Sequence, residues 1–173
     1  VVETWSEILK KVPNSKLLLK SSNKFNEKAI LKKFNKYNLK DSLIVLDHCK
    51  SHEDHLMQYK EADLALDTFP YTGVTTSFEA LWMNVPVLTM KGFNSNSRCG
   101  ESINLNANIE FFIAKDKEEY IDKAIYISEN LEKLDHYRDK LFNEILSSPL
   151  FDTNKFADEF LNKLDYIFNK HKN

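Results

Sequence analysis

Glycine is nearly absent from this sequence. Only three of the 173 residues are glycine, at Gly73, Gly92 and Gly100, and all three lie inside or just after the stretch LDTFPYTGVTTSFEALWMNVPVLTM (66–90). Glycine permits backbone conformations and close approaches that a side chain would block. We therefore expect this stretch to hold the most demanding backbone of the chain: a strand, a tight turn around Gly73, a helix and a second buried strand.

Cysteine is also scarce, and long apolar runs are missing. Cys49 and Cys99 are too few for a disulfide framework, so we expect both thiols to be reduced. No apolar run approaches the roughly 20 residues that span a bilayer. The N-terminal residues lack the basic and then apolar pattern of a signal peptide. These absences predict a cytoplasmic protein with no membrane partner.

Neither sign of charge dominates. The sequence has 24 basic and 26 acidic residues, a formal net charge of −2, which disfavours nucleic acid as the main partner. A hydrophobic fraction of 42% is ordinary for a globular protein and suits one packed core. No internal repeat or linker divides the chain, so we expect a single domain over 1–173. The start at Val1-Val2-Glu3, without methionine, favours a piece of a longer polypeptide, although processing would also explain it.

Short apolar runs alternate with segments of helical spacing. Strands are predicted at 16–20, 42–47, 63–68, 85–90 and 109–114, and helices at 4–11, 24–37, 52–61, from Thr75 onward, and at 118–130, 131–146 and 154–168. This alternation is typical of an α/β fold whose mostly parallel sheet is covered by helices on both faces, here with a helical C-terminal portion. The ligand site is expected at the carboxyl ends of the strands.

Two finer predictions concern the first and last helices. Thr4 and Glu7 match a Thr-x-x-Glu capping box, which would begin the first helix. The last helix should turn one apolar row towards the core, namely Phe156, Phe160, Leu164 and Phe168. The segment SSPLF (147–151) should break the preceding helix because Pro149 cannot continue it.

The helix that follows Gly73 begins at the best candidate ligand site. Helix N-termini expose unpaired N–H groups and a partial positive charge, and therefore bind phosphates. Gly73 lets the backbone come close, and Thr75 and Thr76 add hydroxyl donors. We expect an anion there, with a nucleotide diphosphate as the leading candidate.

Glu79, three residues after Thr76, has two interpretations. It could form a capping box with Thr76 and merely start the helix. Alternatively, the threonine hydroxyls could face a pyrophosphate while the Glu79 carboxylate holds two ribose hydroxyls, as acidic groups do in other nucleotide-binding folds. The local pattern does not separate the two.

The stretch DHCKSHEDH (47–55) invites a metal hypothesis. His52 and His55, however, are three residues apart rather than the four of a zinc-binding helix, and Cys49 has no nearby cysteine partner. We therefore expect no metal, and a strand end, a loop and a polar helical turn whose rim could meet a ligand. A hydrolase triad, a GxSxG motif and a Walker loop are also missing, so no complete catalytic apparatus is visible.

Several segments carry a family resemblance, in order along essentially the whole chain: TWSEILKKVPNSKLLLK (4–20), the stretch 66–90, Ser97-Arg98, IAKDKEEY (113–120) and SSPLF (147–151). Together they resemble the C-terminal half of glycosyltransferase family 41, the O-GlcNAc transferases and their bacterial and plant relatives. The resemblance implies a GT-B architecture, in which two Rossmann-like domains face each other across a cleft. This chain would be the C-terminal, donor-binding domain.

By this resemblance, Thr75 and Thr76 hold the diphosphate of UDP and Glu79 holds the ribose. The loop and helix at 50–58 border the uracil, and His55 matches a histidine of the family's nucleotide site. The nucleotide-sugar-binding residues expected on these grounds are Gly73, Thr75, Thr76, Glu79, His55, Lys50, His52 and Gln58. Neither a metal nor a cofactor is expected.

The sequence departs from the family at several of these positions. Val74 stands where animal members have a histidine, and Glu79 replaces an aspartate. His52 and Gln58 replace a lysine and an arginine, so fewer charged groups would face the nucleotide. The family's essential lysine, which neutralises the leaving diphosphate, lies a few residues before the helix that starts here near Thr4. We therefore expect no catalytic residue in this chain.

The resemblance implies that the full-length protein is an inverting, metal-independent glycosyltransferase that moves a sugar, expected to be GlcNAc from UDP-GlcNAc, to protein serine or threonine. The acceptor protein would be met by a missing N-terminal domain and helical repeats. This chain alone is expected to bind UDP weakly and to transfer nothing.

Two alternatives stay open. The departures at Val74, His52 and Gln58 would also suit a noncatalytic binding or assembly module. The second alternative is another GT-B enzyme, such as a nucleotide-sugar epimerase, and the segments IAKDKEEY and SSPLF disfavour it.

Overall fold

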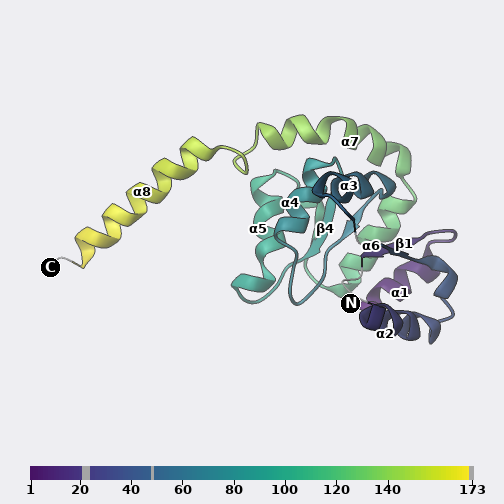
Figure 1. Cartoon of the computed structure of the whole chain (residues 1–173). Helices are drawn as coiled ribbons and strands as arrows, with labels where there is room; N and C mark the ends of the chain where they lie inside the picture. Colours follow the sequence, from purple (N-terminus) through teal and green to yellow (C-terminus); the bar gives the residue numbers. More distant parts are fainter. Residues whose placement is uncertain (21–23, 48, 172–173) are drawn as a thin grey trace.

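The N-terminal part of the chain is a parallel strand–helix–strand unit. The computed structural model describes residues 1–20, 24–47 and 49–171. The first elements are α1 (Val2–Lys11), β1 (Leu17–Lys20), α2 (Lys24–Asn35), the 3-10 helix η1 (Lys40–Ser42) and β2 (Leu43–Leu46) (Figure 1). β1 and β2 are parallel, with Leu17 opposite Leu43 and Lys20 opposite Leu46. Both predicted strands are confirmed, each slightly shorter than its apolar run.

The central part holds a second parallel sheet. Its elements are α3 (His52–Met57), η2 (Gln58–Glu61), β3 (Ala65–Leu66), α4 (Thr75–Trp82), β4 (Val87–Met90), η3 (Ser95–Ser97), α5 (Cys99–Asn106), η4 (Glu110–Phe112) and β5 (Ile113–Ala114). The strand order is β3–β4–β5, so β4 is the middle strand. The expected parallel sheet with flanking helices is confirmed, although the described strands form two sheets rather than one. The strand predicted at 109–114 is reduced to β5 because residues 110–112 form η4.

Strand β4 separates two apolar clusters. Leu88 packs in one cluster with Phe34 and Tyr120, whereas its neighbour Val87 packs in the other with Leu81. Successive side chains of a strand point to opposite faces, so β4 is buried on both sides, as parallel strands between helices are. Two further helices contribute to these clusters, α6 (Lys117–Ser128) to both and α7 (Leu131–Leu146) to the second.

Asparagine, rather than glycine, occupies the positions with a left-handed backbone conformation in the described residues. Asn14, Asn38, Asn84 and Asn108 all have φ near +60°, each just after a helix. None of the three glycines, which all lie in the described part of the chain, has a positive φ. The expectation that glycine supplies unusual backbone angles is therefore wrong. Close packing explains Gly73 instead, because a Cβ there would lie only 2.6 Å from Thr76 Oγ1.

The capping box predicted at Thr4 is wrong. Helix α1 begins at Val2 with Val1 as its N-cap, and no side chain caps it. Thr4 is therefore already inside the helix, where it is buried, and Glu7 pairs with Lys11 at 2.9 Å. With Thr4 as its N-cap the helix would start at Trp5, three residues after the observed start at Val2.

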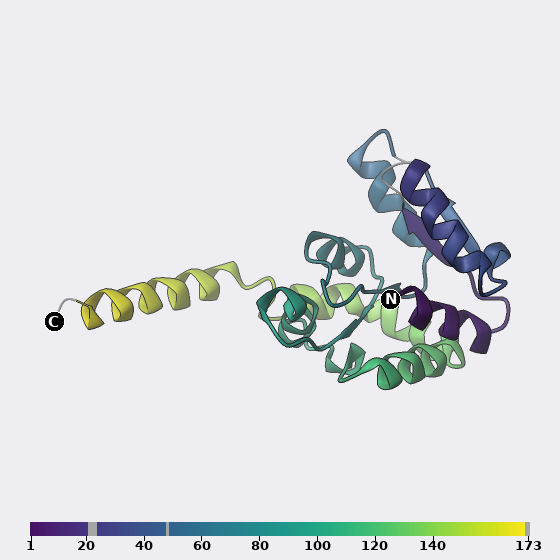
Figure 2. The ribbon, with the colours of Figure 1, turned by 90° about the horizontal axis from the view of Figure 1, so that it is seen from below.

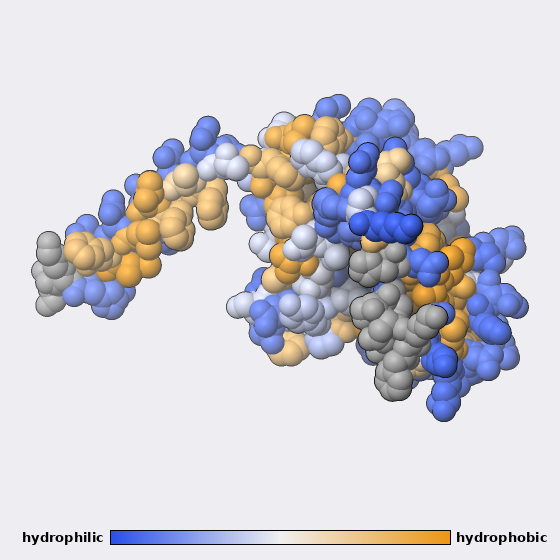
Figure 3. Space-filling model, viewed as in Figure 1, coloured by the Kyte–Doolittle hydropathy of each residue, from blue (hydrophilic) through white to orange (hydrophobic). Residues whose placement is uncertain are grey.

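The core position predicted for the last helix is also wrong. The expected break at 147–151 is present, but α8 (Thr153–Lys170) then extends away from the body in both views (Figure 1; Figure 2). Over its described length no residue of α8 is buried, and Phe156 is 69% exposed. Hydrophobic residues form a strip along this helix (Figure 3). The helical periodicity was correct, whereas no described side chain of α8 is buried.

Candidate nucleotide-binding site

The predicted site lies where β3 ends and α4 begins. A turn over residues 67–74 connects the two elements, and α4 starts at Thr75 with Val74 as its N-cap. Both threonines are exposed. The first N–H groups of a helix have no partner within the helix, so this end presents donors and a partial positive charge. The fold thus places Thr75 and Thr76 at the carboxyl edge of the second sheet, where ligands of parallel sheets bind.

No capping box forms at this helix start. No side chain caps α4, so the structural alternative for Thr76 and Glu79 is wrong. The Glu79 carboxylate instead turns towards α3 and η2, where its Oε2 lies 3.1 Å from His55 Nε2 and 3.2 Å from the Tyr59 hydroxyl. Both side chains of the His55–Glu79 pair are largely shielded from solvent.

The protonation pattern of this group follows from its partners. The Lys20 ammonium, which has only donors, lies 2.7 Å from His55 Nδ1. His55 Nδ1 therefore accepts, which leaves the proton on Nε2 to be donated to Glu79. Burial, and then the Glu79 carboxylate, raise the pKa of the Tyr59 phenol, so Tyr59 stays protonated and donates as well. Lys20 also lies 3.4 Å from Cys49 Sγ.

Sequence reasoning missed Lys20 and Tyr59 in this group. Lys20 ends β1 and stands 35 positions before His55. Tyr59 stands 20 positions before Glu79, and its hydroxyl also lies 3.3 Å from the Thr76 carbonyl oxygen. Both contacts join segments that only the folded sheet brings together. A local motif search has no signal for them.

The other predicted binding residues surround this group less closely. His52 opens α3, and its ring centroid lies 6.0 Å from that of His55. Gln58 opens η2 and is half-buried. Lys50 is exposed in the preceding loop and, within the described residues, makes no hydrogen bond or ion pair with the others. His48, part of the stretch 47–55, lies outside the described residues.

The 67–74 turn uses the Gly73 N–H itself. That group donates to Asp67 Oδ1 at 2.7 Å. Gly73 therefore allows close packing, and the donors that can face a ligand start with the N–H of Val74. Val74 is an exposed apolar residue, so its side chain supplies no charge at this edge.

Neither a metal cluster nor a membrane span emerges from the described residues. Among them, no group of three or more His, Cys, Asp or Glu side chains has a geometry that could hold a metal ion. No helix in residues 1–20, 24–47 and 49–171 is both long and apolar enough to cross a bilayer.

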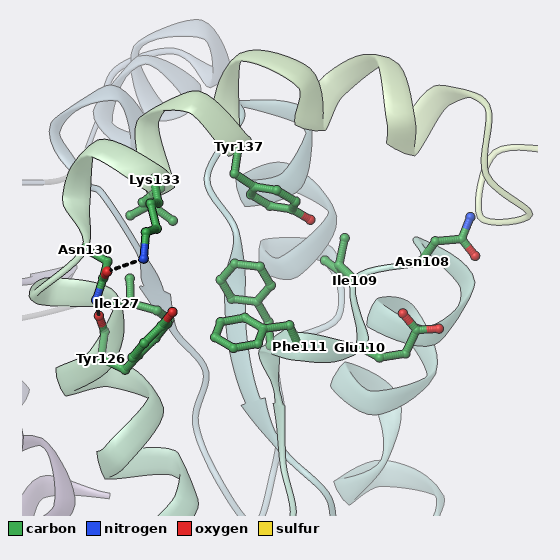
Figure 4. Close-up of a pocket in the computed structure, with 11 residues that line it drawn as sticks. Asn108, Ile109, Glu110, Phe111, Tyr126, Ile127, Asn130, Lys133 and Tyr137 are labelled. Atoms are coloured by element: carbon green, nitrogen blue, oxygen red, sulfur yellow. Dashed lines mark hydrogen bonds between the residues drawn. The ribbon is translucent and has the colours of Figure 1, made fainter.

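A separate hollow of about 370 Å³ lies at the opposite end of the second sheet, beside η4 and the α6–α7 junction (Figure 4). Its lining includes several aromatic rings, and those of Phe111 and Tyr126 lie 5.9 Å apart between centroids. Lys133 beside it donates to Asn130 Oδ1 at 2.8 Å. Because η4 precedes β5, this hollow is at the amino edge of the sheet and is not part of the predicted site.

Comparisons with known proteins agree on one family. Residues 1–160 match the family model of Glycosyl transferase family 41. The chain is 32% identical over 161 residues to the probable UDP-N-acetylglucosamine–peptide N-acetylglucosaminyltransferase SPINDLY of Solanum lycopersicum, covering 91% of this chain and 17% of that protein. It is 28% identical to the probable UDP-N-acetylglucosamine–peptide N-acetylglucosaminyltransferase SEC of Arabidopsis thaliana, covering 99% of this chain and 18% of that protein.

The fold also matches a solved structure. A mutant of the Thermobaculum terrenum O-GlcNAc transferase superposes with a TM-score of 0.86 at 29% identity, covering 94% of this chain and 32% of that one. This chain therefore spans about a third of that structure and under a fifth of the curated relatives.

Proposed function

The chain belongs to glycosyl transferase family 41, and from that premise we propose that it is the donor-binding domain of a protein glycosyltransferase. The full-length protein would move N-acetylglucosamine from UDP-GlcNAc to serine or threonine of an acceptor protein. The names of the relatives support the donor and the protein acceptor. The observation that carries the proposal is the uncapped start of α4 at the carboxyl edge of the sheet, with two exposed threonines.

The start of α4 would bind the diphosphate. Its unpaired N–H groups and the hydroxyls of Thr75 and Thr76 are donors held in place by the fold. Such donors stabilise charge that develops on a leaving diphosphate, each by a few kcal/mol when well aimed. This task needs no metal ion, and we propose metal-independent transfer with inversion at the sugar.

Glu79 would hold the ribose. A carboxylate has about four lone-pair sites, and His55 and Tyr59 both engage Oε2. Acceptor capacity thus remains for two ribose hydroxyls. His55 and Tyr59 would fix the direction of the carboxylate, and Lys50, His52 and Gln58 would border the base.

Transfer itself would need the rest of the protein. The chain spans 17% of its SPINDLY relative, so the acceptor cleft and the group that neutralises the leaving diphosphate are proposed to lie elsewhere in the full-length protein. This chain alone should bind UDP and transfer no sugar.

Calorimetric titration with UDP and with GDP tests the proposal. We expect UDP to bind, and the double variant Thr75→Ala/Thr76→Ala to lose at least about tenfold in affinity because two hydroxyl donors disappear. Thr153→Ala is the matched control, since Thr153 is an exposed threonine that opens α8. Unchanged affinity in the double variant would contradict the proposal.

A noncatalytic binding or assembly module is the second candidate. It is favoured by the exposed apolar Val74 beside the helix start and by the uncharged Gln58. Absence of heat with both UDP and GDP would support this candidate over the transferase.

A further inference from the structure

Asp67 is a buried acid at the heart of the 67–74 turn. It follows β3 and is only 7% exposed, and among the described residues it forms no ion pair. Its Oδ1 accepts the N–H groups of Gly73 at 2.7 Å and of Thr68 at 2.8 Å. Its Oδ2 accepts the Thr89 hydroxyl at 2.8 Å. One carboxylate thus joins the beginning of the turn, its end, and β4.

The surroundings hold this carboxylate in a fixed place. The Asp67 N–H donates to the Leu88 carbonyl at 2.9 Å, and the Asp67 carbonyl accepts the Tyr120 hydroxyl at 2.9 Å. Gly100 at the start of α5 packs directly against it, because a Cβ there would overlap Thr89 Oγ1 and Asp67 Oδ2. The beginning of the turn is therefore held by contacts with buried residues of β4, α6 and α5.

Gly73 links this arrangement to the ligand end of α4. The peptide that donates to Asp67 is followed directly by Val74, Thr75 and Thr76. Fixing the Gly73 N–H fixes the direction of the N–H groups that follow it. A donor set of this kind is effective only when its supporting residues hold it in place before the ligand arrives.

The chemistry of the side chain fits a holding role rather than a binding role. An ionised carboxylate only accepts hydrogen bonds, which matches the three donors around it. Burial raises the pKa of Asp67 above its ordinary value, and the hydrogen bonds from Gly73, Thr89 and Thr68 offset only part of this rise. A negative charge below a diphosphate would repel it, so attraction of the ligand does not explain this acid.

We propose that Asp67 is the positioning residue of the diphosphate-binding turn: its carboxylate oxygens, placed between Gly73 and Thr89, hold the start of α4 in its anion-binding geometry. The ligand in this statement rests on the proposed function, while the effect on the turn does not. Asparagine should substitute well, because its oxygen keeps the Gly73 and Thr68 bonds and its amide can donate to Thr89 Oγ1. Alanine removes all three bonds.

The three glycines provide a direct readout. Labelling with ¹⁵N-glycine gives three amide signals: Gly73 reports the turn, Gly100 its packing partner, and Gly92 serves as an internal control for folding. In Asp67→Ala, we expect the Gly73 amide to shift and to exchange at least about tenfold faster, with UDP affinity reduced by a similar factor. Asp67→Asn should restore both properties to within about threefold of the wild type.

Asp67→Glu guards against an alanine variant that does not fold. It keeps the charge but moves the oxygens, so the proposal predicts faster Gly73 exchange and weaker binding for glutamate than for asparagine. Unchanged Gly73 exchange in both the alanine and glutamate variants would overturn the proposal. So would a glutamate variant that behaves as the wild type while asparagine fails. If the wild type shows no UDP binding but Gly73 responds as expected, the positioning role stands and the proposed function fails.

Discussion

Helices α4 and α8 both have an apolar face, but the face of α4 is buried and the face of α8 is exposed. Leu81 in α4 is 0% exposed and packs in the same apolar cluster as Val87 of β4. Leu161 in α8 is 59% exposed, although both helices follow helical spacing. An apolar pattern therefore identifies which face of a helix can pack against a partner. It does not identify whether the same chain contains that partner.

The largest expected effect comes from a matched pair of leucine truncations, one in each helix. Leu81→Ala should lower the free energy of unfolding by about 3 kcal/mol, because it removes buried methyl groups and leaves a cavity. Leu161→Ala should change it by less than about 0.5 kcal/mol, as exposed substitutions do. Urea titration followed by circular dichroism measures both. Similar losses for the two variants would show that α8 is packed in solution.

The ends of the helices provide a second, smaller contrast. Asn38 follows α2 with φ of 58° and is exposed, and the Leu39 N–H closes back on the Phe34 carbonyl. Asn38→Ala should cost about 1 kcal/mol in the free energy of unfolding because alanine is strained at this φ. Asn38→Gly should cost nothing.

Asn162→Ala on α8 is the control for that variant. Asn162 lies inside an ordinary helix, where alanine is the better helix former, so its replacement should be neutral or slightly favourable. Thermal unfolding measures all three variants. A neutral result for Asn38→Ala would contradict the account of the helix ends.

The smallest expected effect concerns how the free energy of unfolding changes at acidic pH. Arg98 donates to the Glu101 carboxylate at 2.7 Å, and this bond, with a further contribution from Lys91, holds the pKa of Glu101 below its ordinary value of 4.5. A carboxyl group whose pKa is lower in the folded state adds stability above its unfolded value, and that contribution is lost as the pH falls through the folded pKa.

Glu101→Gln should therefore flatten the loss of stability between about pH 6 and about pH 3. Urea midpoints across that range provide the measurement. Glu159→Gln on the exposed α8 should leave the pH dependence as it is. An equal effect of both substitutions would mean that the Arg98 contact does not hold Glu101 ionised.

Much of the fold was predictable because it depends on local patterns. Each strand lies within a short apolar run that was predicted as a strand. Thr75 was correctly expected to open a helix. The capping box at Thr4 was wrong because the helix already begins at Val2, which capping chemistry alone does not reveal. Of the two reasons expected for glycine, close approach holds at Gly73, whereas unusual backbone angles do not, since asparagine also adopts the left-handed conformation at helix ends.

The candidate site was predictable only in part. Thr75, Thr76 and Glu79 belong to one short motif, and the fold brings His55 to Glu79. Asp67 escaped notice because its partner Thr89 stands 22 positions away on another strand. Lys20 and Tyr59 were missed for the same reason. The residues proposed to bind the ligand share a local motif, whereas the residues proposed to position them do not.

The most direct test of the central claim is a crystal structure of this chain soaked with UDP. The site at α4 and the aromatic hollow beside Phe111 are the two regions to compare. We predict the diphosphate at hydrogen-bonding distance from the N–H groups and hydroxyls of Thr75 and Thr76, with the ribose beside Glu79. Nucleotide found only in the aromatic hollow, or a diphosphate away from the start of α4, would contradict the account.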